Sequence, residues 1–224
     1  MFDQVRERVL ARLVGKDSKG RQRAAVHCGH SLLEELVEPW WKTPRVEQAV
    51  ELGLLLHLYA RLLDDAVDED DTESRENLLP AQLLFFDAVV GIERAFPAKT
   101  TQTRRLFDRA LRLNAPNMQD QEQLGARNVH LLVAPTLLAE QLEPTQEEAL
   151  LDYLWVLQAR EELAQGACAL HLAVAFERVV ERLLQSPFEA WGWRNLPVRS
   201  QCQSLLDFLK THTDAFSDVP PAQP

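Results

Sequence analysis

The segment from Glu51 to Asp71 constrains the fold more than any other part of the chain. Leucines and one tyrosine recur in it at steps of three and four residues, which is typical of a helix that is buried along much of its surface. Its last turns carry Asp64, Asp65 and Asp68, and three further acids follow directly. Because carboxylates at a helix C-terminus oppose the macrodipole at roughly 0.3–1 kcal/mol each, the pattern costs folding energy unless something compensates it.

A divalent cation is the compensation that the spacing favours. Asp64 and Asp68 are four residues apart, so on a helix their carboxylates lie on one face, and Asp65 stands about 100° round from Asp64. Carboxylate oxygens suit Mg²⁺, which keeps several waters and takes further ligands from a substrate phosphate. The pattern therefore predicts Mg²⁺ held by these three aspartates. The alternative is a solvated acidic helix end that leads into a polar loop.

The composition indicates an all-α protein. Hydrophobic residues make up 46% of the chain and charged residues 26%, which is ordinary for a globular domain. Good helix formers dominate, and prolines fall between the periodic segments. The 224 residues are enough for one domain with a sizeable core. We therefore predict a single-domain bundle of about eight helices over residues 1–216, followed by a flexible Pro-rich tail over residues 217–224.

The periodicity and the prolines indicate where the helices lie. We expect the sixth helix to kink near Pro135, and Gly166 to mark a bend or a close contact in the seventh. The expected helices cover about residues 2–14, 21–37, 44–68, 80–96, 101–113, 119–141, 144–184 and 199–212.

Charge and cysteine usage narrow the class of protein. The net charge of −10 discourages nucleic acid and anionic membranes as partners. Cys28, Cys168 and Cys202 form no CxxC pair, which indicates reduced, buried thiols and a cytoplasmic location. The N-terminus carries charges where a signal peptide needs an apolar core, and no apolar run reaches the ~18 residues of a membrane span. We therefore expect a soluble protein without a membrane span.

A second acid pair lies far along the chain. Glu161 and Glu162 interrupt an apolar helical pattern, and Gln158 and Gln165 lie on the same helix face as Glu162. Burying such a pair is costly unless a cation or a base compensates it. The alternative is an ordinary exposed pair of glutamates.

Together, the acidic motifs resemble those of the class I isoprenoid synthase superfamily, which includes the trans-isoprenyl diphosphate synthases and the terpene synthases. The sequence DDAVD at residues 64–68 is similar to the family's first motif, DDxxD. His57 stands seven residues before it, where the family carries His or Gln. Residues 158–165 follow the spacing of the second motif, QxxDDxxD, with glutamates for both paired aspartates.

The basic residues resemble the family's in part. The segment KGRQR at residues 19–23 lies about forty residues before the first motif, as does the family's diphosphate-binding loop. The paired arginines that follow the first motif are reduced to Arg75, and Lys99 is the only lysine between the two motifs. The motifs also lie closer together than in the family, so this is a short and divergent member. The losses affect chain elongation with isopentenyl diphosphate more than they affect diphosphate binding.

The resemblance implies a Mg²⁺-dependent enzyme that processes a prenyl diphosphate, by prenyl transfer or by terpene synthesis through ionisation of an allylic diphosphate. It implies a helical bundle around a central apolar cavity, with Phe85, Phe86 and Leu56 as candidates for setting its depth, and a homodimer or a pairing with a homologous synthase. The implied metal ligands, of which the aspartates are also catalytic, are Asp64, Asp65, Asp68, Glu161 and Glu162. The implied substrate contacts are Arg21, Arg23, His57, Arg75 and Gln158.

Two other functions remain open from the sequence. The chain is either a catalytically degenerate family member that acts as a binding or regulatory subunit, or an unrelated acidic helical bundle that binds other proteins. The glutamates in the second motif, the missing basic residues and the short length of the chain favour the degenerate family member.

Overall fold

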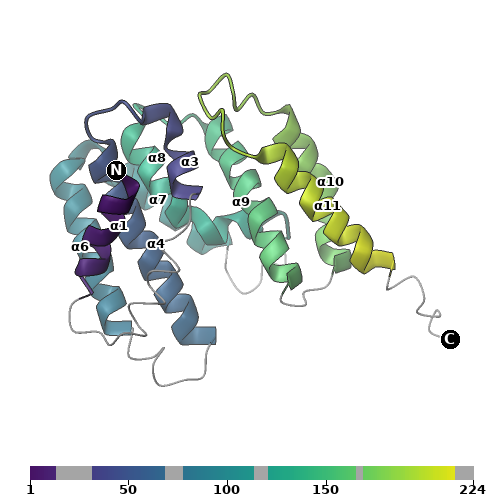
Figure 1. Ribbon diagram of the computed structural model, residues 1–224, viewed down its shortest axis with the longest axis horizontal. Helices are drawn as coiled ribbons and strands as arrows, with labels where there is room; N and C mark the ends of the chain where they lie inside the picture. Colours follow the sequence, from purple (N-terminus) through teal and green to yellow (C-terminus); the bar gives the residue numbers. More distant parts are fainter. Residues whose placement is uncertain (14–31, 69–77, 114–120, 165–168, 215–224) are drawn as a thin grey trace. The chain divides into compact units, whose positions relative to one another are not determined.

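Every regular element in the described part of the chain is a helix. The computed structural model describes residues 1–13, 32–68, 78–113, 121–164 and 169–214 (Figure 1). The all-α prediction is confirmed for these residues. None of the helices among them is both long enough and apolar enough to cross a membrane.

The chain divides into two compact units, each built from separate stretches of sequence. The first comprises residues 1–108, 130–142 and 189–195, and the second comprises residues 109–129, 143–188 and 196–224. Two of the five boundaries fall inside helices, one in α7 (Thr100–Leu113) and one in the 3₁₀ helix η3 (Gln121–Leu132). One domain over residues 1–216 with a tail over 217–224 stays a prediction, and the tail lies outside the described residues.

Helix α4, Val46–Asp68, is the central element of the first unit. Its leucines are buried over most of its length, as the periodicity predicts. It is in close contact with α6 and α8, and Gly53 lies so near α8 that an added Cβ would be 3.0 Å from the Cβ of Ala134. The helices packed around α4 are α1 (Phe2–Ala11), α3 (Leu32–Leu36), α6 (Leu78–Ala95) and α8 (Val133–Leu138).

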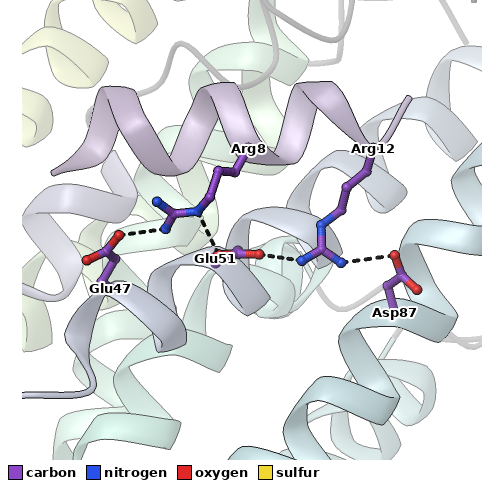
Figure 2. Close-up of polar contacts among 5 residues, drawn as sticks. All are labelled: Arg8, Arg12, Glu47, Glu51 and Asp87. Carbon is purple, nitrogen blue, oxygen red and sulfur yellow. Dashed lines mark hydrogen bonds and ion pairs between the residues drawn. The ribbon is translucent and has the colours of Figure 1, made fainter. Parts of the chain in front are cut away.

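Two arginines of α1 connect it to α4 and α6 (Figure 2). Arg8 donates to Glu47 at 2.7 Å and to Glu51 at 3.1 Å, while Arg12 pairs with Glu51 and donates to Asp87 at 3.0 Å. Exposed ion pairs contribute only about 0–1 kcal/mol each. The buried valines of α1 therefore supply most of its docking energy, and the ion pairs determine its register on α4 and α6.

A tryptophan corner closes the first unit. The indole N–H of Trp193 donates to the carbonyl of Leu36 at 2.8 Å, and its ring meets the edge of Trp40 at a centroid distance of 5.5 Å. Trp40 ends the short 3₁₀ helix η1, Glu38–Trp40, whose Glu38 accepts hydrogen bonds from Asn195. Residues 189–195 therefore belong to the first unit although their sequence neighbours belong to the second.

The second unit is built on α9, Pro144–Ala164, which packs against α10 (Ala169–Gln185) and α11 (Val198–Asp214) (Figure 1). Tyr153 and Trp155 of α9 are fully buried. Asp152 accepts two hydrogen bonds from Arg182 of α10, each 2.9 Å long, so a paired fork joins these two helices.

The structure differs from the expected helices over residues 119–141. A 3₁₀ helix covers Gln121–Leu132, and the chain departs from helical geometry at Asn128 rather than at Pro135. Pro135 lies in the first turn of α8, where a missing N–H costs nothing. The expected single helix over residues 144–184 is two helices, α9 and α10. The 3₁₀ helix η2 (Pro97–Lys99) precedes α7.

Gly125 and Gly91 offer a matched test of this packing. A Cβ on Gly125 would lie 2.1 Å from the carbonyl oxygen of Leu151 in the backbone of α9, whereas a Cβ on Gly91 would lie 2.4 Å from the terminal Cδ2 of Leu52. We expect Gly125→Ala to lower the free energy of unfolding by about 3 kcal/mol because backbone cannot yield. We expect Gly91→Ala to cost clearly less, since a side-chain end can move and alanine favours a helix by about 1 kcal/mol. Urea unfolding followed by tryptophan fluorescence measures both, and equal costs would contradict the close contact at Gly125.

Cys202 of α11 gives the fold a pH dependence. Burial raises the pKa of its thiol from 9.0 to about 11. Below pH 9 the thiol keeps its proton in both states, whereas between the two pKa values only the unfolded chain ionises, so stability falls as the pH rises. We expect wild type to lose about 1–2 kcal/mol more than Cys202→Ala between pH 8.5 and 10.5. Chemical denaturation of both proteins across this range tests the difference, and parallel curves would contradict it.

Candidate functional site

The first acidic motif lies at the C-terminal end of α4. The side chain of Asp64 is 53% exposed, and its carboxylate lies 3.4 Å from the guanidinium of Arg61 one turn earlier. Asp65 is half-buried. The last turn of α4 contains no basic residue, so the carboxylates there face the negative end of the helix dipole. Asp68 is the last residue of α4, and its side chain lies outside the described residues.

These donors suit one kind of metal site. Asp64 and Asp65 offer hard oxygen ligands that reach solvent, and Mg²⁺ is commonly held by one or two carboxylates together with waters and substrate phosphates. Among the described side chains, no group of three or more His, Cys, Asp or Glu residues is arranged to hold a metal ion. The described donors therefore form no all-protein cage, and Mg²⁺ shared with a substrate phosphate stays a prediction.

His57 is buried in the first unit, two turns before the acidic pair. Its Nδ1 lies 2.9 Å from Nε2 of His130, one nitrogen donating and the other accepting, and the two rings stack at a centroid distance of 5.0 Å. The pair joins α4 to the end of η3 across 73 residues of sequence. Nδ1 of His57 is already used in the contact with His130. A hydrogen bond between His57 and a substrate stays a prediction.

The second acidic motif forms a polar network within the second unit. Gln158 is buried on α9, accepts a hydrogen bond from Asn128 at 2.6 Å, and donates to Glu162 at 3.1 Å. Glu162 also pairs with Arg127. The shared face predicted for Gln158 and Glu162 is therefore confirmed, while Glu161 is half-buried and Gln165 lies outside the described residues.

Arg127 is the basic residue that the sequence analysis missed. Glu162 is half-buried, with its side chain 24% exposed, and Arg127 of η3 supplies a compensating positive charge from 35 residues away in sequence. No spacing rule links Arg127 to Glu162 over such a distance in the sequence. The one local hint was that Arg127 is the only positively charged residue in the segment LGARNVHLL. Lys99 has a structural role instead: its ammonium donates to the carbonyl of Ala139 at 2.6 Å and to that of Glu140, just beyond the end of α8.

The candidates for the depth of a cavity divide between core and surface. Leu56 is fully buried, and the half-buried Phe85 packs against Tyr59 at a centroid distance of 5.0 Å. Phe86 is 61% exposed, so its assignment to an interior cavity is wrong. Consecutive residues are about 100° apart on a helix, so Phe86 points away from the face that carries the half-buried Phe85 and reaches the outer face of α6.

The remaining predicted contacts fall outside the described part of the chain or in separate units. Arg21, Arg23 and Arg75 lie outside the described residues. The first motif belongs to the first unit, and Glu161 and Glu162 belong to the second. A single metal centre that uses both motifs stays a prediction.

Comparisons with known proteins identify no relative of this chain: no family model, curated protein or solved structure matches it. The resemblance to isoprenoid synthases therefore rests on the sequence motifs alone and stays a prediction.

The histidine pair can be tested by a double-mutant cycle. His57→Leu and His130→Leu each remove one ring and leave a buried nitrogen without its partner, so we expect each to lower the free energy of unfolding by about 1–3 kcal/mol. We expect the double substitution to cost at least about 0.5 kcal/mol less than the sum of the single substitutions, because the second loss no longer breaks the same bond. Urea unfolding gives all three values, and strict additivity would show that the pair contributes no coupling.

Proposed function

We propose that this chain is a Mg²⁺-dependent enzyme that processes a prenyl diphosphate, with Asp64, Asp65 and Asp68 as its first metal-binding motif. One observation carries the proposal: a buried 23-residue helix ends in acidic side chains, and that of Asp64 is 53% exposed although Arg61 lies 3.4 Å from its carboxylate. Carboxylates at the negative end of a helix dipole favour a bound cation. The sequence DDAVD and its position at the C-terminal end of a buried helix support the same chemistry.

The proposed reaction breaks the bond between an allylic carbon and the diphosphate oxygen. When bound, Mg²⁺ would stabilise the charge that develops on the departing diphosphate. Asp64 and Asp65 would orient the metal-bound diphosphate at the end of α4. Arginines suit the remaining phosphate oxygens because their donors form a planar fork. Arg21, Arg23 and Arg75 are the candidates for this role.

A second candidate function is favoured by the network around Glu162. Arg127 and Gln158 already bind this carboxylate, so a metal at the second motif would have to displace an arginine. Such an arrangement is expected of a catalytically degenerate family member that binds a diphosphate or a homologous synthase without turnover. The enzyme remains the first choice because the carboxylate of Asp64 in the first motif is 53% exposed.

Pyrophosphate release from geranyl or farnesyl diphosphate tests the proposed reaction. We expect release that requires Mg²⁺, and we expect Asp64→Asn to lower kcat/KM by about 100-fold or more, as the loss of one strong transition-state contact does. Asp108→Asn on α7 is the matched control, because its 51% exposed side chain lies 3.9 Å from Arg104 as Asp64 lies near Arg61. If no allylic diphosphate releases pyrophosphate in the presence of Mg²⁺, the proposed enzymatic activity is contradicted.

Thermal unfolding with Mg²⁺ and inorganic pyrophosphate separates the two candidates. A ligand at about 100 times its Kd stabilises the folded state by ~2.7 kcal/mol, which raises Tm by roughly 5–10 °C in a chain of this size. We expect this shift in wild type and in Asp108→Asn, and its loss in Asp64→Asn. A Tm shift without pyrophosphate release supports the degenerate binding protein. If neither the Tm shift nor pyrophosphate release is observed, the acidic helical bundle that binds other proteins is the interpretation that is supported.

A further inference from the structure

Helix α1 is docked on α4 through a narrow row of apolar side chains. Val5, Val9 and Leu13 follow one another at steps of four residues and are buried, whereas most other side chains of this segment are exposed. A helix that belongs to a core normally buries a wider face, as α6 does. The single row is instead typical of an amphipathic helix that lies in the groove of a binding partner.

Two arginines beside this row bind three carboxylates. Arg8 and Arg12 are four residues apart on α1, and Glu47 and Glu51 are four residues apart on α4, so two arginines face two glutamates (Figure 2). Arg8 bridges Glu47 and Glu51. Arg12 bridges Glu51 and Asp87 of α6. Because each arginine is shared between two carboxylates, a shift of α1 by one turn would leave one arginine without its partners.

The contacts of α1 indicate that it opens separately from the rest of the first unit. It packs mainly against α4. Its ten residues are too few for a stable isolated helix, so α1 unfolds once it leaves α4. The buried Nε of Arg6 has no hydrogen-bond partner among the described residues, which weakens the docked state. A segment with few buried side chains and solvent-exposed polar contacts is expected at the low-stability end of a domain.

Opening of α1 uncovers a surface that is both apolar and acidic. Glu51 is the most enclosed of the three carboxylates, with its side chain 18% exposed, and both arginines bind it. Three carboxylates face two arginines, so the surface on α4 and α6 carries more negative charge than the arginines neutralise. Such a surface selects a partner that brings arginines at the same spacing.

We propose that Glu47, Glu51 and Asp87, together with the apolar surface of α4 beneath α1, form a docking site for a basic amphipathic helix. The pattern that it recognises is Φ-x-x-R-Φ-x-x-R-Φ, where Φ is an aliphatic residue, as in VRERVLARL at residues 5–13. Helix α1 occupies the site in cis as a ligand that opens separately, so a partner helix of the same pattern competes with it. The site contains none of the residues assigned to the proposed reaction and does not depend on that reaction.

Hydrogen–deuterium exchange of the full chain tests whether α1 opens separately. We expect the amides of residues 2–11 to exchange at least about 100-fold faster than those of residues 52–62 in α4. We expect raising NaCl from about 0.05 M to about 0.5 M to speed exchange in α1 several-fold, because salt screens its ion pairs.

Substitution of the two arginines tests whether they hold α1 in place. We expect Arg8→Gln combined with Arg12→Gln to speed exchange in α1 about tenfold at low salt and to remove the salt dependence. Arg104→Gln combined with Arg105→Gln is the matched control, because it removes two exposed arginines from α7 and changes the net charge equally. We expect exchange in α1 of this control to match wild type.

A labelled peptide of residues 1–13 tests recognition in trans by fluorescence anisotropy. We expect it to bind the full chain that carries Arg8→Glu and Arg12→Glu with a Kd on the order of 100 μM, because the reversed charges weaken docking in cis. We expect wild type to bind it at least about tenfold more weakly, since its own α1 competes at an effective concentration in the millimolar range. We expect the same peptide with Arg8→Gln and Arg12→Gln not to bind.

Three results would overturn the inference. They are α1 amides that exchange as slowly as those of α4, exchange in α1 that neither salt nor the loss of both arginines changes, and a peptide that binds the charge-reversed chain no better than wild type. Circular dichroism and urea unfolding check that each variant is folded. If the chain with both glutamates does not fold, the chain with Arg8→Gln and Arg12→Gln replaces it in the peptide experiment under the same criteria.

Discussion

The burial of α4 is the constraint on which the first unit depends. Fully burying a leucine contributes about 1.5–3 kcal/mol, and Leu55, Leu56, Leu58 and Leu62 are all buried. The carboxylates at the end of the helix cost roughly 0.3–1 kcal/mol each. Burial therefore exceeds the electrostatic cost several-fold, so the packing of α4 does not require a bound cation. A metal at this end would add to the stability of the folded chain rather than create it.

The features that could be predicted from the sequence are those that follow from the 3.6-residue period of a helix. The buried leucines of α4 and the acids at its end follow from steps of three and four residues. The expected start near Pro44 and the observed start at Val46 differ by two residues, which is the usual uncertainty of a helix boundary. The shared helix face of Gln158 and Glu162 follows from the same period. In the structure the side chain of Gln158 donates a hydrogen bond of 3.1 Å to Glu162.

The sequence could not predict contacts between distant residues. His57 meets His130 across 73 residues, and Arg127 meets Glu162 across 35, with no periodic signal to connect either pair. The close approach of Gly125 in η3 to the backbone of α9 was equally unpredictable. It depends on how the two helices pack, which no local sequence pattern records. Phe86 illustrates a different limit: α6 is apolar on both sides, so its period could not tell the inner face from the outer one.

The packing of α6 on α4 links the stability of the first unit to its acidic motif. α6 packs against α4 through Ala81, Leu84, Ala88 and Ile92, so a substitution that loosens α6 also lowers the stability of the helix that carries Asp64. A bound ligand raises Tm only as far as it favours the folded state over the unfolded state. The loss of a metal-induced change in Tm therefore reports on the acidic motif only in a variant that keeps the wild-type Tm when no metal is present.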